Sequence, residues 1–491
     1  MTYRTCLPVL ISIILIQATV NAQPDSVWAR IFNAGGWDEC SDIVEKSDGG
    51  FVLAGFTLAG EELQEEFYLL ETDNTGFHVN DLTIGGAGMD MASSIVMTET
   101  GDYLVGGWSS TVSAGEQDMY LAGVSGIGLN EQWHHTYGGA SQERCISMIR
   151  NNQNEIIMAG YTSSFGEGSG DFWMVCVNQA GDSLWSRTYG SVENDECAAI
   201  IQTADGGYVL AGQTSSYGSG DWDFWLVRTD QSGLVLWAKS YGGAERERCY
   251  DVVETSDGGF LLAGETRSFG AGGNDAWIVR TNSYGDSLWS HTFGGTADDG
   301  FQSICLRSQN GAILGGYTDS FAEHNSDMWM VRVDGNGNRL WDRTFCGRSN
   351  LSWDECSVVK ATADGGFVLA GYTGYAPGSW QDADFILVKT DADPMEIEHS
   401  PSLIPSGFAL QVFPNPFNVT STIGLTVPTN QGMRLSVYNI QGQLIRDVVH
   451  GPIGIGTHYL TFDGDGLSSG VYFVNLQGAN YNATQKIVLL K

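Results

Sequence analysis

The chain has 491 residues, of which 42% are hydrophobic and 11% aromatic, and it contains 65 glycines but only 10 prolines. This composition is typical of a folded protein built from many short strands and tight turns. Its 58 acidic and 23 basic residues give a formal net charge of −35, which excludes a nucleic-acid-binding protein because that class needs a basic surface. Solubility alone explains such an acidic surface, although it also suits contact with divalent cations.

The N-terminus predicts a signal peptide over residues 1–22. Arg4 supplies the basic start, an apolar run covers residues 7–16, and residues 20–22 form a small-residue cleavage site. No later stretch approaches the roughly 18 apolar residues of a membrane-spanning helix. We therefore expect a secreted or outer-surface protein with no membrane span.

Residues 23–393 contain seven tandem units of about 52 residues each. One glycine recurs in every unit, at Gly55, Gly107, Gly160, Gly212, Gly264, Gly316 and Gly371. A tryptophan recurs in all units but the second, at Trp28, Trp133, Trp185, Trp237, Trp289 and Trp341. A fixed period of this length indicates a repeat architecture.

Each unit reads as four strands, which in the clearest copy cover residues 184–189, 197–203, 208–214 and 223–229. Asp205-Gly206 predicts a two-residue hairpin turn whose two positions tolerate positive φ. Four strands per unit are typical of propeller blades, so we predict an all-β chain with a seven-bladed β-propeller. The strand containing Trp28 can complete the seventh blade and close the ring, or it can begin the first blade. The sequence leaves both frames open.

Five cysteines occupy one equivalent position in five units: Cys40, Cys145, Cys197, Cys249 and Cys356. A repeated position indicates one repeated packing environment, so we expect buried thiols. A cysteine metal site would require Cys-x-x-Cys spacing, which the chain lacks. Cys346 and Cys356 are the local pair that a disulfide could join.

Residues 394–408 read as a linker, and residues 409–491 as a separate C-terminal domain. Alternating segments predict strands over residues 409–413, 421–427, 434–439, 458–462, 470–476 and 486–490. Six or seven short strands in this length suggest a small immunoglobulin-like β-sandwich.

Two family resemblances accompany these patterns. Residues 412–418, 435–445, 467–473 and 486–491 resemble, in order, the type A sorting domain of type IX secretion, which implies the secretion machinery as a partner. The Asp230-x-x-Gly233 hairpins before Trp237 resemble quinoprotein-like repeats, and the whole pattern resembles secreted glycine-rich bacterial propellers, some labelled endoglucanase-like. The quinoprotein cofactor is not implied, because its adjacent cysteine pair is missing.

One position is acidic in all seven units: Asp38, Asp90, Glu143, Asp195, Glu247, Asp299 and Asp354. Each precedes the strand expected to lie innermost, so a bound Ca²⁺ could offset their mutual repulsion. The favoured interpretation is structural, with each carboxylate accepting N–H groups of its own loop. A second acidic position, which begins the fourth predicted strand in six units, has the same expected role: Asp118, Asp171, Asp223, Asp275, Asp327 and Asp384.

The residue after the repeated glycine breaks the symmetry: Phe56, Trp108, Tyr161, Gln213, Glu265, Tyr317 and Tyr372. Aromatic faces beside a carboxylate suit sugar stacking, although sheet aromatics also pack cores. Trp108, Tyr161, Glu265, Tyr317 and Tyr372 are therefore the candidate ligand-binding residues. Glu265 is the first candidate for a catalytic carboxylate.

The sequence favours a secreted propeller that binds a polysaccharide or a surface protein, acting as a monomer. Ligand contacts are expected in the loops over residues 163–170, 215–221 and 268–274. A glycoside hydrolase is the first alternative, but no pair of carboxylates can be selected from the sequence. A structural surface protein is the second alternative.

Overall fold

A computed structural model describes residues 26–59, 64–307, 311–322, 325–347, 352–375, 383–392 and 409–490, the last range except 414, 416, 419, 428–430, 454–455, 465 and 479–481. The predicted signal peptide and the whole of the predicted linker lie outside these residues. The chain divides into two compact units, residues 1–397 and 398–491. Within the described residues, no helix is long and apolar enough to cross a membrane.

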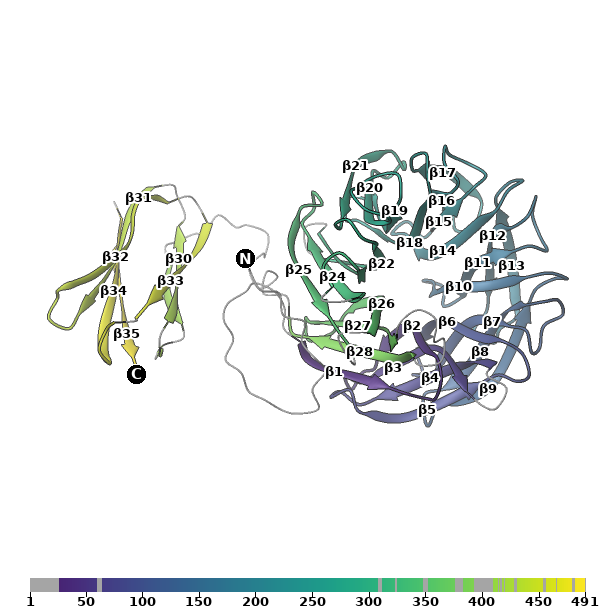
Figure 1. The fold of residues 1–491 in the computed structure, drawn as a ribbon, viewed down its shortest axis with the longest axis horizontal. Helices are drawn as coiled ribbons and strands as arrows, with labels where there is room; N and C mark the ends of the chain where they lie inside the picture. The colour runs from purple at the N-terminus through teal and green to yellow at the C-terminus, as the bar shows by residue number, and fades with distance from the viewer. Residues whose placement is uncertain are drawn as a thin grey trace. The chain divides into compact units, whose positions relative to one another are not determined.

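The first unit consists of seven four-stranded antiparallel sheets, which are the blades of a propeller (Figure 1). Blades 1 and 2 contain β2 (Asp38–Glu45), β3 (Phe51–Ala59), β4 (Gln64–Thr72), β5 (His78–Ile84), β6 (Asp90–Met97), β7 (Tyr103–Ser109), β8 (Asp118–Ser125) and β9 (Asn130–Tyr137). Blades 3 and 4 contain β10 (Glu143–Arg150), β11 (Ile156–Thr162), β12 (Asp171–Val177), β13 (Ser183–Tyr189), β14 (Asp195–Gln202), β15 (Tyr208–Thr214), β16 (Asp223–Thr229) and β17 (Val235–Tyr241).

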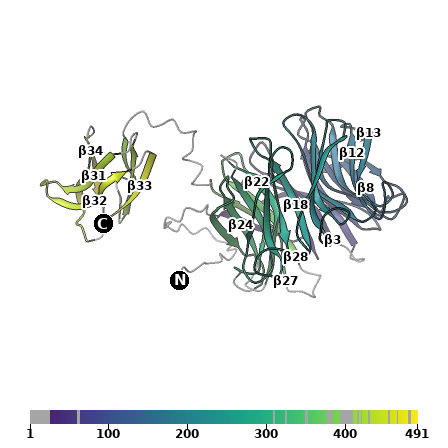
Figure 2. The same ribbon diagram turned by 90° about the horizontal axis from the view of Figure 1, so that it is seen from above.

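Blades 5 and 6 contain β18 (Glu247–Glu254), β19 (Phe260–Thr266), β20 (Asp275–Thr281), β21 (Ser287–Phe293), β22 (Asp299–Leu306), β23 (Ala312–Thr318), β24 (Asp327–Val333) and β25 (Arg339–Phe345). Blade 7 contains β26 (Ser352–Ala361), β27 (Phe367–Tyr375), β28 (Ala383–Thr390) and β1 (Ser26–Phe32). The first strand of each blade lies nearest the central axis, and Figure 2 shows the ring from the side.

The N-terminal strand closes the ring. β1 pairs antiparallel with β28, with Ser26 opposite Thr390 and Phe32 opposite Phe385. This pairing selects the first of the two frames that the sequence left open. It gives the seventh blade its outer strand and removes an unpaired edge from the ring.

Apolar side chains of adjacent blades form the core of the ring. Each cluster joins two neighbouring sheets, as where Phe172 of blade 3 meets Trp225 of blade 4, with ring centroids 4.6 Å apart. The five equivalent cysteines are buried free thiols, as their repetition predicted. The prediction of a disulfide between Cys346 and Cys356 is wrong, because the thiol of Cys356 is free.

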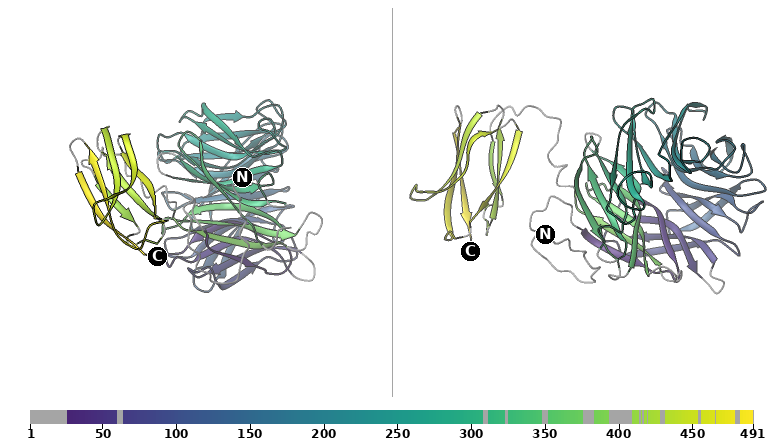
Figure 3. Two further views of the ribbon diagram at one scale, coloured as in Figure 1. Left: turned by 60° about the vertical axis from the view of Figure 1, so that its left-hand side comes forward. Right: turned by 45° about the horizontal axis from the view of Figure 1, so that its top comes forward.

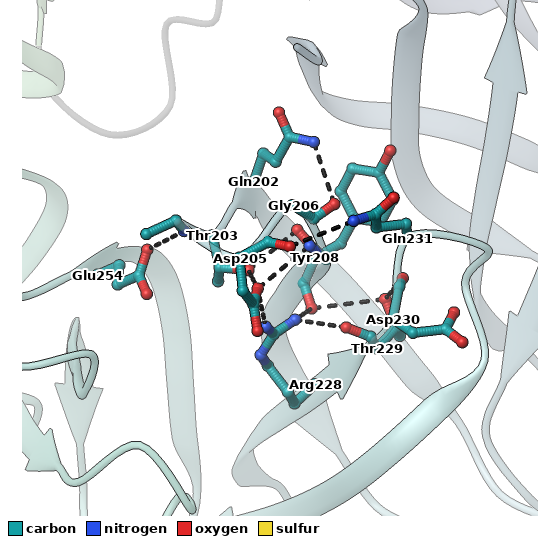
Figure 4. Close-up of polar contacts among 12 residues, drawn as sticks. Gln202, Thr203, Asp205, Gly206, Tyr208, Arg228, Thr229, Asp230, Gln231 and Glu254 are labelled. Carbon is teal, nitrogen blue, oxygen red and sulfur yellow. Dashed lines mark hydrogen bonds and ion pairs between the residues drawn. The ribbon is translucent and has the colours of Figure 1, made fainter. Parts of the chain in front are cut away.

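The hairpin between the second and third predicted strands of a unit has a longer turn than predicted. Gly206 has φ +89°, but Asp205 is not in the positive-φ region, and Thr203 N–H donates to Gly207 O at 3.0 Å. The prediction of a two-residue turn is therefore wrong, although the predicted hairpin itself is confirmed. Asp205 instead binds the Arg228 guanidinium (Figure 4), which also donates to Tyr208 O at 3.1 Å.

The second unit is all-β and has two sheets. One contains β29 (Ala409–Phe413), β30 (Thr420–Val427) and β33 (Gly456–Asp463). The other contains β31 (Gln431–Asn439), β32 (Leu444–Ile453), β34 (Gly470–Gly478) and β35 (Asn482–Leu489). Ile423 and Leu425 of the first sheet pack with Val437 and Val474 of the second in one core, and Figure 3 shows the two layers. The immunoglobulin-like character stays a prediction.

Candidate binding site at the mouth of the central channel

Strand alternation decides on which face of a blade each side chain lies. The first strand of each blade carries a buried acid at or near its start, so the residue after that acid faces the other way. In the seven blades that next residue is Glu39, Met91, Arg144, Glu196, Arg248, Gly300 or Glu355. These residues pair in register with Phe56, Trp108, Tyr161, Gln213, Glu265, Tyr317 and Tyr372 of the second strands. We call these fourteen positions the mouth ring.

The first strands of all seven blades line a cavity of about 760 Å³, which four of the fourteen mouth-ring residues border. Glu39, Trp108 and Arg144 of the mouth ring border this cavity, and Tyr250 and Gln302 contribute further polar groups. A volume of this size falls in the range of small-molecule pockets, about 300–1,000 Å³. The symmetric scaffold thus carries an asymmetric set of polar and aromatic side chains.

Glu265 is the centre of a hydrogen-bonded group that joins blades 5 and 6. Tyr317 donates to its Oε2 at 2.9 Å, and Tyr250 donates to its Oε1 at 3.3 Å. Arg248 lies on the same carboxylate at 3.5 Å. Glu265 is only 5% exposed, so these partners hold it in place rather than leave it free toward solvent.

Another part of the mouth ring is acidic. Burial raises the pKa of Glu39 to about 7, and the nearby charge of Glu355 adds to the effect. Burial also raises the pKa of Glu355, while hydrogen bonds from the Tyr372 hydroxyl and from Gln302 act in the opposite direction. Tyr372 packs on Trp37, with ring centroids 5.8 Å apart.

Blades 2 and 3 supply an aromatic wall. The Arg144 guanidinium lies 4.9 Å from the centroid of the Trp108 ring, and its Nε donates to Gln117 Oε1 at 2.8 Å. Trp108 is 6% exposed and Tyr161, next along the ring, is partly exposed. Guanidinium and indole are therefore fixed against one another at the channel mouth.

Of the five residues predicted to bind ligand, Trp108 borders the cavity, while Tyr161, Glu265, Tyr317 and Tyr372 are not among the residues that line it. The five do not form one cluster. Glu265 and Tyr317 are in contact, whereas Tyr372 pairs with Glu355. The sequence alone did not single out their first-strand partners, above all Glu39, Arg144, Arg248 and Glu355. Their signal is the position directly after the repeated acid, where charge and size change from unit to unit.

The seven repeated acids do not line the cavity. They are at most 2% exposed, and each accepts a backbone N–H of the preceding loop, as from Gly139 to Glu143 at 2.7 Å and from Gly243 to Glu247 at 2.8 Å. In blade 3, Thr162 at the end of the second strand also donates to Glu143, at 2.9 Å. Among the described residues no group of three or more His, Cys, Asp or Glu side chains could hold a metal ion.

Carboxylates of the two repeated acidic positions face each other between blades. A Cβ at Gly190 would collide with Asp171 Oδ1 and would lie 2.7 Å from Asp195 Oδ2, so both oxygens border one point. Asp171 Oδ1 is buried without a hydrogen-bond partner among the described residues, while Oδ2 accepts the Glu167 N–H at 2.7 Å. Burial raises the pKa of Asp171 to about 6, and the charge of Asp195 adds to the effect.

Residues 411–490 match the family model described as secretion system C-terminal sorting domain. The second unit therefore carries a sorting domain, which the type IX secretion machinery recognises, and the protein is secreted to the outer cell surface. No curated protein sequence matches the chain.

Several solved structures are similar to the chain at low sequence identity. PorZ, a bacterial surface component of the type IX secretion system of Porphyromonas gingivalis, is 13% identical with a TM-score of 0.45 over 91% of this chain. The chain spans 59% of the length of PorZ. YCF48, solved with a D1 peptide, is 11% identical with a TM-score of 0.43, over 77% of this chain and 100% of that one. The propeller domain of the Trilobed protease from Pyrococcus furiosus is 8% identical with a TM-score of 0.39, over 72% and 94%.

Proposed function

We propose that this secreted propeller is a binding protein that recognises a polysaccharide at its mouth ring. The observation that carries the proposal is the divergence of the ring. Two sets of seven equivalent positions on a repeated scaffold hold aromatic, acidic and basic side chains, and four of these residues border a cavity of about 760 Å³. A purely structural channel has no need for such variety, because the blades share one architecture.

The chemistry of the ring suits a sugar. Tyr161 offers a partly exposed aromatic ring, and Glu39, Arg144 and Gln302 offer acceptors and donors for hydroxyl groups beside the cavity, where Trp108 packs against Arg144. Aromatic side chains combine an apolar face with a polar tip, which matches the two-sided character of a pyranose ring. A surface protein is the other class of ligand, and a protein that only builds a surface layer would bind neither.

The test is titration of the full chain with a panel of oligosaccharides, followed by the variants Tyr161→Ala and Trp108→Ala. Loss of one stacking face is worth about 0.5–1.5 kcal/mol, so we expect affinity to fall by about 2- to 12-fold. Tyr284→Ala is the matched control, because Tyr284 is 71% exposed in the turn between β20 and β21, at the opposite end of the blade. Thermal melts establish that each variant is folded. Equal affinity of all three variants would exclude the mouth ring as the sugar site.

A glycoside hydrolase is the alternative, and one observation favours it. A pKa of about 7 keeps much of Glu39 protonated at neutral pH, as a general acid requires, and Glu355 supplies a second carboxyl group nearby. Release of reducing ends by the wild-type protein, lost in Glu39→Gln, would establish the enzyme. Saturable binding without release would leave the binding protein.

A further inference from the structure

Three arginines converge where blade 5 meets the mouth ring. Arg246 and Arg248 flank the buried acid at the start of β18, and Arg267 directly follows β19. The whole chain has 23 lysines and arginines against 58 acidic residues, so this concentration of positive charge runs against its composition. We call these three residues the arginine trio.

Two members of the trio face each other across the β18–β19 pair. Arg267 N–H donates to Arg246 O at 3.0 Å, which extends the register of Glu247 with Thr266 and places the two arginines opposite one another. Like charges directly opposite in an antiparallel pair are destabilising. Arg248 lies two residues beyond Arg246, on the same face of the strand. The arrangement therefore costs stability in the unliganded protein.

Part of the trio's hydrogen-bonding capacity is unused. Arg246 Nε is buried and has no hydrogen-bond partner among the described residues. Arg248 shares Glu265 with two tyrosine hydroxyls, and its own contact with that carboxylate is long, at 3.5 Å. Burial and the charge of Arg248 lower the pKa of Arg246, although Tyr250 and Glu265 act in the opposite direction, and Tyr250 and Glu265 help to raise the pKa of Arg248.

The trio is connected to the mouth ring through side-chain hydrogen bonds. Arg267 Nε donates to Asn274 Oδ1 at 2.6 Å, and the Asn274 side chain also contacts the Tyr317 hydroxyl. Trp222 pairs with Arg246 along the backbone and is partly exposed. Asn274 therefore links Arg267 to Tyr317 of the mouth ring, of which Arg248 is itself a member.

We propose that the arginine trio is an anion subsite that binds the carboxylate of a hexuronate unit in the polysaccharide. This inference rests on the proposed function and specifies the class of glycan. Guanidinium groups bind carboxylates and sulfates through paired N–H donors, and a bound anion would offset the repulsion within the trio. The overall charge of −35 does not prevent this, because charges beyond about 8 Å are largely screened at physiological ionic strength.

The experiment compares two forms of one ligand on the full chain. A galacturonate hexamer is titrated by calorimetry beside the same hexamer with its carboxylates methyl-esterified, so that only charge differs. We expect the acid form to bind at least about tenfold more tightly, since hydrogen bonds to charged groups are worth about 1.5–3 kcal/mol. Arg246→Gln and Arg267→Gln are expected to remove that preference. Arg187→Gln, on the outer strand β13, is the matched control and is expected to keep it.

Three outcomes would contradict the proposal, and they can be told apart. If both forms bind equally and the arginine variants change nothing, the anion subsite is refuted while the proposed function stands. If neither form binds but neutral or sulfated oligosaccharides do, hexuronate is refuted as the class, and a sulfated ligand lost in Arg246→Gln identifies the other anion source. If an oligoglutamate peptide binds at the trio and no glycan binds anywhere, both proposals fail. Arg246→Gln is expected to melt no lower than the wild type, because it removes a repulsive cross-strand pair.

Discussion

Replacement of Asp171 by asparagine should stabilise the propeller at neutral pH. Asp171 Oδ1 and Asp195 Oδ2 border the same point beside Gly190, and Asp171 Oδ1 has no hydrogen-bond partner among the described residues. In Asp171→Asn the amide oxygen can keep the bond from Glu167 N–H, and the amide nitrogen can donate to Asp195. A buried pair of acceptors becomes a donor and an acceptor.

The size of the expected stabilisation follows from the pKa of Asp171, which is raised from 3.8 to about 6. A raised carboxyl pKa means that the folded state binds the proton more tightly, so the free energy of unfolding falls as pH rises from about 4 to about 6. The full shift corresponds to about 3 kcal/mol, and solvent screening reduces this to about 1–2 kcal/mol. Asp171→Asn lacks this penalty at every pH.

Urea denaturation of the wild type and the variant at pH 7.5, 6.0 and 5.0 measures the effect. The variant should be more stable by about 1–2 kcal/mol at pH 7.5, and the difference should shrink toward pH 5, where the wild type is protonated. Asp182→Asn, at an exposed position in the same blade, is the control. A variant less stable than the wild type at pH 7.5, or a difference independent of pH, would refute the carboxylate pair.

Three further outcomes are expected. Asp205→Ala should destabilise the propeller by about 1–3 kcal/mol in thermal melts, because it leaves the Arg228 guanidinium, 5% exposed, without its carboxylate. Asp221→Ala is the control, and a melting temperature of Asp205→Ala equal to that of this control would contradict the prediction. Burial raises the pKa values of Cys145 and Cys356 to about 12, so these thiols should resist maleimide labelling in the native protein and react only after unfolding. Rapid labelling of the native protein would show that the thiols are accessible. Deletion of residues 411–490 should prevent appearance of the protein at the cell surface, as followed by fractionation, and normal export of the truncated chain would show that the sorting domain is dispensable.

The repeat made most of the fold predictable from the sequence, whereas the way in which the ring closes was not predictable. Period and glycine placement indicated seven blades of four strands, but the frame depended on the pairing of Ser26 with Thr390, which lies outside any one repeat. In the C-terminal unit β32 was not predicted, because residues 444–453 interrupt their apolar alternation with charged and glycine residues.

The sequence singled out only the second-strand residues of the candidate site, because their first-strand partners depend on strand pairing. The second-strand residues Trp108 and Glu265 attracted attention because they break a pattern, whereas Glu39 and Arg248 read as ordinary exposed charges. Their proximity becomes apparent once the strand register places Arg248 opposite Glu265. Contacts between blades, such as that of Tyr317 with Glu265, depend on three-dimensional closure and have no local signal.

Closure by β1 also determines how the propeller responds to tension. Ser26 begins β1 and lies opposite Thr390, where β28 ends, so the two points at which the chain enters and leaves the ring are on the same end of one strand pair. A force that pulls these points apart loads the hydrogen bonds of β1 one after another rather than all together. A propeller held through its C-terminal side and pulled from its N-terminal side should therefore peel open at β1 under low force, with the other six blades still folded.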